Sequence, residues 1–108
     1  MERINLTNEN GVKNPSWFNI DGAEYFKEDT CHDGRNWISH ATGEQWRHEG
    51  LYITAKKRFI LNCWSNYQGS RESYKVISKE EAVEWLIRNN YYEEVEIAYA
   101  DILATYEV

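Results

Sequence analysis

Residues 51–77 read LYITAKKRFILNCWSNYQGSRESYKVI and carry the clearest strand pattern in the chain. Apolar side chains occupy every second position along 51–55 and again along 59–64, which is the period of two residues that strands show. A third run, Tyr-Lys-Val-Ile at 74–77, follows after a turn-rich segment. We therefore predict a three-stranded antiparallel meander, stabilised by pairs of aromatic and β-branched side chains on neighbouring strands.

Two breaks separate the expected strands. Lys56 and Lys57 lie at the tip of the first hairpin, where two like charges are solvated. Neither residue adopts positive φ as readily as Gly or Asn, so a longer turn that includes Arg58 is an alternative. The second break, 65–70, combines Ser, Asn and Gly, which are turn-forming residues. Three strands alone are marginally stable, so another element must cover one face of the sheet.

The composition indicates a single compact domain, 1–108. Of the 108 residues, 42% are hydrophobic and 28% are charged, which is too apolar for disorder and ordinary for a soluble surface. No apolar run approaches the roughly 18 residues of a membrane helix, and the first residues lack the apolar core of a signal peptide. We expect a cytoplasmic protein that does not insert into membranes, in which Cys31 and Cys63 are thiols.

The first fifty residues show weaker patterns. We treat 1–14, which is rich in Asn, as a flexible arm. A strand is a candidate at 17–20, but the residues that follow resemble a helix start, and we expect a short helix at about 21–28. The run 31–36 contains Asp-Gly and is expected to turn, before a brief strand at 37–39.

The segment after the meander starts with a helix signature. Ser78 and Glu81 have the spacing of a capping box, in which the Ser78 hydroxyl accepts from the Glu81 backbone and the Glu81 carboxylate reaches back. The pattern predicts a helix over 79–89 with one apolar side turned toward the sheet. That side consists of Ala82, Val83, Leu86 and either Trp85 or Ile87.

A further helix is expected at 93–106, because apolar residues there have helical spacing. A strand at 95–99, in which Val, Ile and Tyr alternate with Glu and Ala, is the competing prediction. The fold class we predict is α+β, with a three- to four-stranded antiparallel meander and one or two C-terminal helices packed on one face.

Charge is distributed unevenly along the chain. The 12 basic and 18 acidic side chains give a net charge of −6, with −4 over 1–50, +4 over 51–77 and −6 over 78–108. The expected sheet is thus the only positive segment. Such a distribution informs about partners and not about the fold.

Three blocks of the sequence resemble a known family. The blocks are DGRNWISHATGEQWRHEGLY at 33–52, LNCWSNYQGSRESY at 61–74 and ISKEEAVEWLIRN at 77–89. In order and spacing they are similar to a family of small, uncharacterised bacterial proteins with DGxNxIS, ATGxQxxHExLY, WSxxQGS and EEAxxWL blocks. The resemblance implies a single domain and no activity, cofactor or catalytic residue. Lys57 is a departure, because members of this family tend to have a small residue in the hairpin.

A second alternative function is a small hydrolase or a metal-binding protein that uses the Cys and His side chains. Zinc sites usually contain a close ligand pair with two or three residues between the ligands, and here the candidate ligands are close only as immediate neighbours. A nucleophile, Cys31 or Ser39, would also need a base and an orienting group within hydrogen-bond reach. We therefore expect no metal, no cofactor and no catalytic residue. The donors considered are Cys31, His32, His40, His48, Glu49 and Cys63.

Single-stranded nucleic acid is an alternative partner. A sheet face with aromatic rings and cations can stack bases and neutralise phosphates. Against this partner, the acidic pI of about 5.0 opposes approach to a polyanion. Alternatively, the cations lie at hairpin tips and the aromatic residues pack under the helix. The residues concerned are Lys56, Lys57, Arg58, Arg71 and Lys75 with Trp64, Tyr67 and Tyr74.

Binding of another protein is the function that we favour. The loop 64–71 offers Trp, Tyr and Arg, which are enriched at interface hot spots. The acidic segment 78–108 suits a basic groove, in the manner of small inhibitors or immunity proteins, although acidic helices also simply confer solubility. We expect Asp33 and Asn36 to hold loop backbone. The predicted binding residues are Trp64, Tyr67, Gln68 and Arg71 on the loop, with Arg35, His48 and Glu49 before the meander.

Overall fold

The computed structural model describes residues 2–7, 13–32, 34–43, 46–65 and 72–108. Within them, antiparallel strands form three sheets, and three short helices follow toward the C-terminus. The predicted α+β class is confirmed, with more strands than expected. In chain order the elements are β1 (Arg3–Thr7), β2 (Lys13–Asn19), β3 (Glu24–Lys27), β4 (Thr30–His32), β5 (Trp37–Ser39), β6 (Arg47–Ile53), β7 (Phe59–Ser65), β8 (Ser73–Ile77), α1 (Lys79–Arg88), α2 (Tyr92–Ala98) and α3 (Ala100–Thr105).

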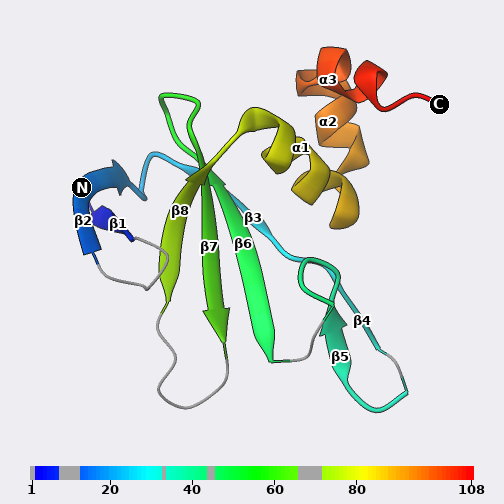
Figure 1. Ribbon diagram of the computed structural model, residues 1–108, viewed down its shortest axis with the longest axis horizontal. Coiled ribbons are helices and arrows are strands. Elements are labelled where there is room, and N and C mark those ends of the chain that lie inside the picture. The colour runs from blue at the N-terminus through cyan, green and yellow to red at the C-terminus, as the bar shows by residue number, and fades with distance from the viewer. Residues whose placement is uncertain (1, 8–12, 33, 44–45, 66–71) are drawn as a thin grey trace.

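The largest sheet has the strand order β3-β6-β7-β8, and each neighbouring pair is antiparallel (Figure 1). β6, β7 and β8 form the meander that the sequence predicts, and β3 adds a strand beside β6. The register places Leu51 of β6 opposite Leu61 of β7 and Phe26 of β3. Directly opposite side chains share a face of the sheet, so these three begin one hydrophobic core.

α1 covers this face of the sheet. Trp85 and Leu86 are each 1% exposed, and Val83 is completely buried. The tryptophan, and not the half-buried Ile87, therefore completes the apolar side of the helix. Complete burial of a side chain such as Val83 or Leu86 stabilises the fold by roughly 1.5 to 3 kcal/mol.

Ser78 begins α1 as predicted. Its Oγ accepts a hydrogen bond from the Glu81 backbone N–H at 3.1 Å. The Ser78 hydroxyl in turn donates a hydrogen bond to Oε1 of the Glu81 side chain at 3.2 Å. The acidic first turn also lies at the positive end of the helix dipole, which favours it electrostatically.

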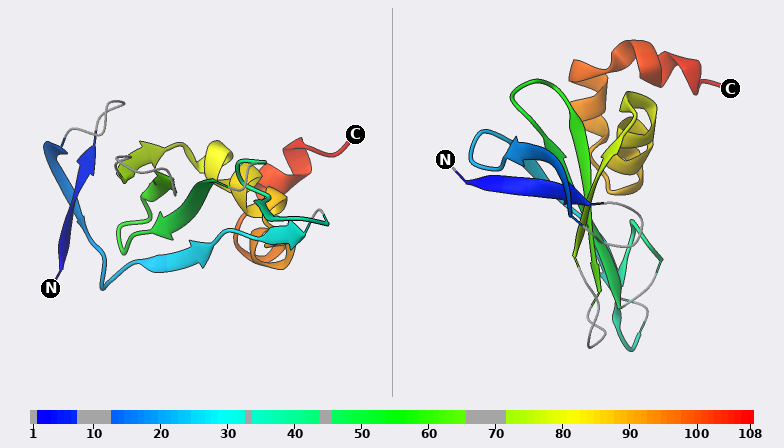
Figure 2. Two further views of the ribbon diagram at one scale, coloured as in Figure 1. Left: turned by 90° about the horizontal axis from the view of Figure 1, so that it is seen from below. Right: turned by 60° about the vertical axis from the view of Figure 1, so that its left-hand side comes forward.

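The β1–β2 hairpin packs on the opposite face of the sheet. Figure 2 shows the hairpin on one side of the central strands and the helices on the other. Leu6 and Phe18 from the hairpin are buried in one cluster with Ile60 of β7. The candidate strand at 17–20 lies largely within β2, and the segment treated as an arm, 1–14, contributes the paired strand β1.

Thr7 fixes the hairpin to the outer edge of β8. Its Oγ1 accepts a hydrogen bond from the Tyr74 backbone N–H at 2.8 Å and donates one to the Tyr74 carbonyl at 3.3 Å. One side chain thus occupies both backbone groups that Tyr74 directs away from β7.

The short helix expected at about 21–28 is wrong, because this segment contains β3. As a strand it places Phe26 in the helix-side core and Tyr25 on the other face of the sheet. A helix of two turns is marginal by itself, whereas pairing with β6 satisfies the backbone and buries Phe26. Asp21 accepts a hydrogen bond from the Glu2 backbone N–H at 2.8 Å through Oδ2.

The expected helix at 93–106 is interrupted at Tyr99. The φ of Tyr99 is −133°, outside the helical range, and it separates α2 from α3. The Tyr99 ring packs edge-on against Phe59 with ring centroids 6.0 Å apart. Val95, before Tyr99 in the sequence, and Ile102, after it, are both buried. The competing strand at 95–99 is wrong. None of the helices in the described ranges is long and apolar enough to cross a membrane.

β4 and β5 form a separate hairpin that projects from the sheet beyond β3 (Figure 1). β5 is the brief strand expected at 37–39, whereas β4 takes in Cys31 and His32 from the run expected to turn. Trp37 is 63% exposed, and its ring meets that of His32 edge-on at 5.2 Å.

The first hairpin of the meander closes through the longer turn that includes Arg58. The Lys57 N–H donates to the Thr54 carbonyl at 2.8 Å, and the Thr54 N–H donates to the Arg58 carbonyl at 2.9 Å. Lys57 has a φ of +62°. Gly and Asn adopt this conformation more readily than Lys does.

Candidate functional site

Two of the predicted binding residues meet on the sheet face turned away from the helices. His48 of β6 pairs with Trp64 of β7, and their rings stack 5.7 Å apart with 25° between the planes. Both side chains are half-buried. The other predicted residues of this loop, Tyr67, Gln68 and Arg71, lie outside the described residues.

Glu28 holds His48 from the edge of the sheet. Nδ1 of His48 lies 2.7 Å from Oε1 of Glu28, whose side chain is 3% exposed. The other oxygen of this carboxylate, Oε2, is buried and has no hydrogen-bond partner among the residues that the structure describes. Because a buried carboxylate depends strongly on its partner, this contact fixes the orientation of the histidine.

Glu49 points toward α1 instead, because adjacent strand residues face opposite sides of a sheet. Its Oε1 accepts a hydrogen bond from Trp85 Nε1 at 3.1 Å, and its Oε2 accepts one from Cys63 Sγ at 3.7 Å. Burial raises the pKa of the Glu49 carboxyl above its ordinary value. Glu49 therefore joins β6, β7 and α1 inside the protein and lies on a different face from His48.

A second pair of carboxylate and histidine lies at the end of α1. Oδ2 of Asp29 is 3.2 Å from Nδ1 of His40, and the Asn90 side-chain amide donates to the same carboxylate. The hydrogen bond from Asn90 lowers the pKa of the Asp29 carboxyl. The Asp29 backbone N–H also donates to Asn89 Oδ1 at 2.9 Å. These contacts tie the helix end to the chain between β3 and β4.

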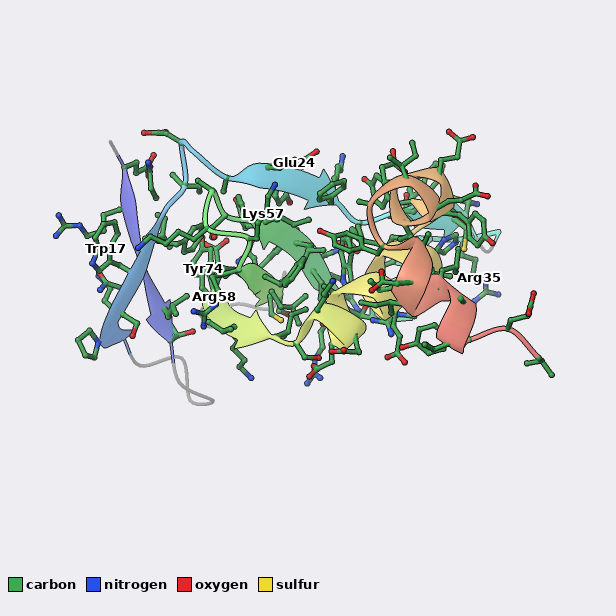
Figure 3. The ribbon with its side chains drawn as sticks, turned by 90° about the horizontal axis from the view of Figure 1, so that it is seen from above. Trp17, Glu24, Arg35, Lys57, Arg58 and Tyr74 are labelled. Atoms are coloured by element: carbon green, nitrogen blue, oxygen red, sulfur yellow. The ribbon has the colours of Figure 1, made fainter. Side chains whose placement is uncertain are left out.

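Arg35 and Asn36 lie in the exposed connection between β4 and β5. Figure 3 shows Arg35 at the end of the molecule opposite Trp17. Arg35 is thus on a separate hairpin from His48 and Trp64, and the three do not form one site. Asp33 lies outside the described residues, and a structural role for Asn36 stays a prediction.

The side chains considered for metal binding or catalysis are dispersed. Within the described part of the chain, no group of three or more His, Cys, Asp and Glu side chains could hold a metal ion. Burial, followed by the charge of Glu49, raises the pKa of the Cys63 thiol, which disfavours the reactive thiolate. Ser39 Oγ accepts hydrogen bonds from the backbone of Ala41 and Thr42 at 3.1 and 3.3 Å, a structural role in a turn.

The face that carries His48 and Trp64 also carries a cluster that the sequence analysis did not identify. The ring centroids of Tyr25 and Tyr52 are 4.6 Å apart, and those of Tyr52 and Tyr74 are 6.5 Å apart. Tyr25 is 45% exposed. We call this cluster the tyrosine face and define it as Tyr25, Tyr52, Asn62, Glu72 and Tyr74.

Glu72 lies within electrostatic reach of all three tyrosine hydroxyls. Its Oε1 accepts a hydrogen bond from Asn62 Nδ2 at 3.1 Å. Burial raises the pKa of Tyr25, Tyr52 and Tyr74, and the negative charge of Glu72 raises each pKa further. The charge of one exposed carboxylate therefore acts on three tyrosine hydroxyls.

Gly50 makes room for Tyr25 on this face. A β-carbon on residue 50 would lie 2.6 Å from the Tyr25 hydroxyl oxygen, which is closer than real contacts allow. The absence of a side chain at this position therefore lets the tyrosine ring lie close to the strand. Any larger residue would displace Tyr25.

Comparison with protein-family models, with curated proteins and with solved structures finds no match. The resemblance to an uncharacterised bacterial family therefore stays a prediction.

Trp64 and Tyr74, two of the aromatic residues considered for nucleic-acid binding, do not pack under the helix. Trp64 and Tyr74 lie on the opposite face, and Figure 3 shows Tyr74 between the sheet and the N-terminal hairpin. That part of the alternative prediction is wrong, whereas Lys56 and Lys57 do lie at a hairpin tip. The alternation within the meander predicts that Tyr74 and Asn62 share a face, but the helix expected at 21–28 hid the contribution of Tyr25, which packs against Tyr52.

Proposed function

We propose that this chain is a non-enzymatic protein-binding module, of the kind of a small acidic inhibitor or immunity protein, that recognises a basic surface of another protein. The tyrosine face is the observation that supports this proposal. Tyrosine contributes a large, rigid contact area with a polar tip and is enriched at interface hot spots. The carboxylate of Glu72 among the rings favours a cationic partner over an anionic one.

The helical layer adds negative charge at longer range. Glu93, Glu94 and Glu96 are all exposed on α2. The segment 78–108, to which they belong, carries a net charge of −6. Negative charge gathered on one layer attracts a positively charged partner as the two proteins approach. At physiological salt this attraction acts over about one Debye length, roughly 8 to 10 Å.

The geometry gives less support to single-stranded nucleic acid. Lys56, Lys57 and Arg58 are exposed at the tip before β7, whereas Trp64 lies about 17 Å further along that strand. Lys75 pairs with Leu61 on the helix side of the sheet. Bases stacked on the tyrosine face would bring their phosphates toward Glu72, which is unfavourable.

A comparison of two labelled probes tests the proposal. We expect a peptide rich in arginine and lysine to bind with an affinity that falls as salt is added, because opposite charges attract through the solvent. A single-stranded oligonucleotide of similar length should not bind. Fluorescence anisotropy over a series of salt concentrations measures both affinities.

Charge reversal provides the matched variant. Replacing the three acidic residues of α2 together, Glu93→Lys, Glu94→Lys and Glu96→Lys, should slow association with the basic peptide and flatten its salt dependence in stopped-flow measurements. An acidic peptide of equal length is the control probe. Binding of the oligonucleotide without the basic peptide would replace the proposal by its nucleic-acid alternative.

A further inference from the structure

Glu72 offers an exposed carboxylate in a fixed orientation. The buried Asn62 side chain donates one hydrogen to Glu72 Oε1 and one to the Ser73 carbonyl, both at 3.1 Å. Burial and then the charge of Glu72 raise the pKa of the Tyr74 hydroxyl, so this carboxylate acts on Tyr74 as well. Since a carboxylate accepts about four hydrogen bonds, Glu72 keeps acceptor capacity for a donor that arrives from solvent.

Tyr25 is 45% exposed and packs against Tyr52, whose ring also contacts the buried Phe18 of the β1–β2 hairpin. The rings of Tyr25 and Tyr52 are tilted by 39° at a centroid separation of 4.6 Å, over the strand position that Gly50 leaves open. A cation within about 6 Å of a ring centroid is attracted by the ring. A planar guanidinium stacks on such rings and presents several N–H donors, whereas an ammonium is a compact, strongly hydrated charge.

The charges that act on these rings are predominantly acidic. Besides Glu72, the charge of Glu28 acts on Tyr25 and that of Glu2 acts on Tyr52, and both add to the effect of burial in raising the tyrosine pKa. Lys27 follows on the same strand as Tyr25, where its side chain is exposed. Among the described residues, the carboxylates that act on these rings favour a positive ligand, and Lys27 is a flexible cation that can move aside.

We propose that the tyrosine face is an arginine-binding site, in which a guanidinium group of the partner protein lies on the rings of Tyr25 and Tyr52 and donates hydrogen bonds to Glu72. This site rests on the proposed function, because a basic protein has to supply the arginine. It adds the chemical group recognised and the residues that recognise it.

A short arginine peptide, acetylated and amidated at its ends, is the probe for this site. In proton–nitrogen NMR spectra we expect it to shift the signals of the Asn62 side-chain amide and the Gly50 backbone amide. The Asn62 amide is a direct reporter, because it donates to the carboxylate that the guanidinium would engage. A peptide with lysine in place of arginine should bind more weakly, and one with the uncharged isostere citrulline should not bind.

Two substitutions test the two halves of the site. Glu72→Gln removes the charge and should weaken binding of the arginine peptide about tenfold or more, the effect of losing one charge-assisted hydrogen bond. Gly50→Ala should weaken binding by displacing Tyr25, and it should fold normally because the exposed ring can move. Glu93→Gln on α2 makes the same charge change elsewhere and should alter the affinity by less than about twofold.

The outcomes separate the site from the general function. Shifts confined to α2, with an unchanged Asn62 signal, would overturn the arginine site and leave recognition of a basic partner standing. Equal affinity for the lysine peptide would overturn the preference for guanidinium. The absence of binding by every basic peptide would overturn the site and the proposed function together.

Discussion

Glu49 and Asp29 are two carboxylic acids whose surroundings have opposite effects on proton binding. Burial raises the pKa of Glu49, whereas the hydrogen bond from Asn90 lowers the pKa of Asp29. Folding therefore favours the protonated form of Glu49 and the ionised form of Asp29. Acidification strengthens the contribution of the first residue to stability and removes that of the second.

The Glu49→Gln variant should reveal this titration. The folded protein binds a proton at Glu49 at pH values above the ordinary pKa of 4.5, where the unfolded chain has lost it. The contribution of Glu49 is therefore present below pH 4.5 and is lost as the pH rises through the higher pKa of the folded state. We expect the free energy of unfolding of Glu49→Gln, relative to that of the native sequence, to increase over this interval.

Urea unfolding at a series of pH values measures the difference. Glu93→Gln is the control, because it makes the same substitution at an exposed position on α2. Parallel stability profiles for the native sequence and Glu49→Gln would contradict the assignment of Glu49 as a buried acid with a raised pKa.

In the turn between β6 and β7, Lys57 has a strained backbone conformation. Lys57 has a φ of +62°, which costs a residue with a side chain about 1 to 2 kcal/mol. Lys57→Gly should remove that strain and lose about 0.5 to 1 kcal/mol through the flexibility of glycine. We expect a net increase in the free energy of unfolding of up to about 1 kcal/mol, measured by urea denaturation.

Lys56→Gly is the matched control for this prediction. Lys56 does not have a positive φ, so glycine there brings only added flexibility and should lower the free energy of unfolding. Equal effects of the two substitutions would show that the left-handed conformation of Lys57 carries no strain.

The sequence was sufficient for elements with long, regular patterns. The meander and α1 were predicted because alternation and the Ser78 cap agree with the tertiary packing. β3 was not, because a four-residue strand with polar flanks has little pattern of its own and depends on β6 for its pairing. The end of α2 at Tyr99 was also missed, since the contact with Phe59 joins residues far apart in the chain.

The candidate site was predictable only in part, for a related reason. His48 and Trp64 were chosen by residue type, and strand pairing brings them together. Glu49 was grouped with them because the first meander strand was expected to begin at Leu51. In the structure this strand begins at Arg47, so His48 and Glu49 both belong to it. Adjacent residues of a strand face opposite sides of the sheet.

The whole molecule has a sheet with a different cover on each face. The helices lie on one side and the β1–β2 hairpin on the other, as Figure 2 shows. The radius of gyration is 14.7 Å. A compact chain of this length has a value of about 13 Å, which is consistent with hairpins that project from the central body.

The two sides of the sheet should unfold together. Phe18→Ala removes a buried ring from the hairpin side and should lower the free energy of unfolding by about 3 kcal/mol. Since β7 belongs to both cores, the NMR signal of the Trp85 indole on the helix side should disappear at the same reduced urea concentration as the signals of β1 and β2.

A neighbouring substitution is the control. Trp17→Ala removes a ring that is 47% exposed on the outer side of the hairpin and should have a much smaller effect. Loss of the hairpin signals in Phe18→Ala while the Trp85 signal persists to the original midpoint would show that the layers are independent.

The threonine that bridges the N-terminal hairpin to β8 has one more effect. An outermost strand whose central amide and carbonyl are open can template the addition of another chain, which is how fibrils grow. Thr7 already engages both groups of Tyr74. With both groups engaged, this part of the border of the sheet offers a further chain no backbone partner at Tyr74, and we expect it to resist amyloid-like stacking.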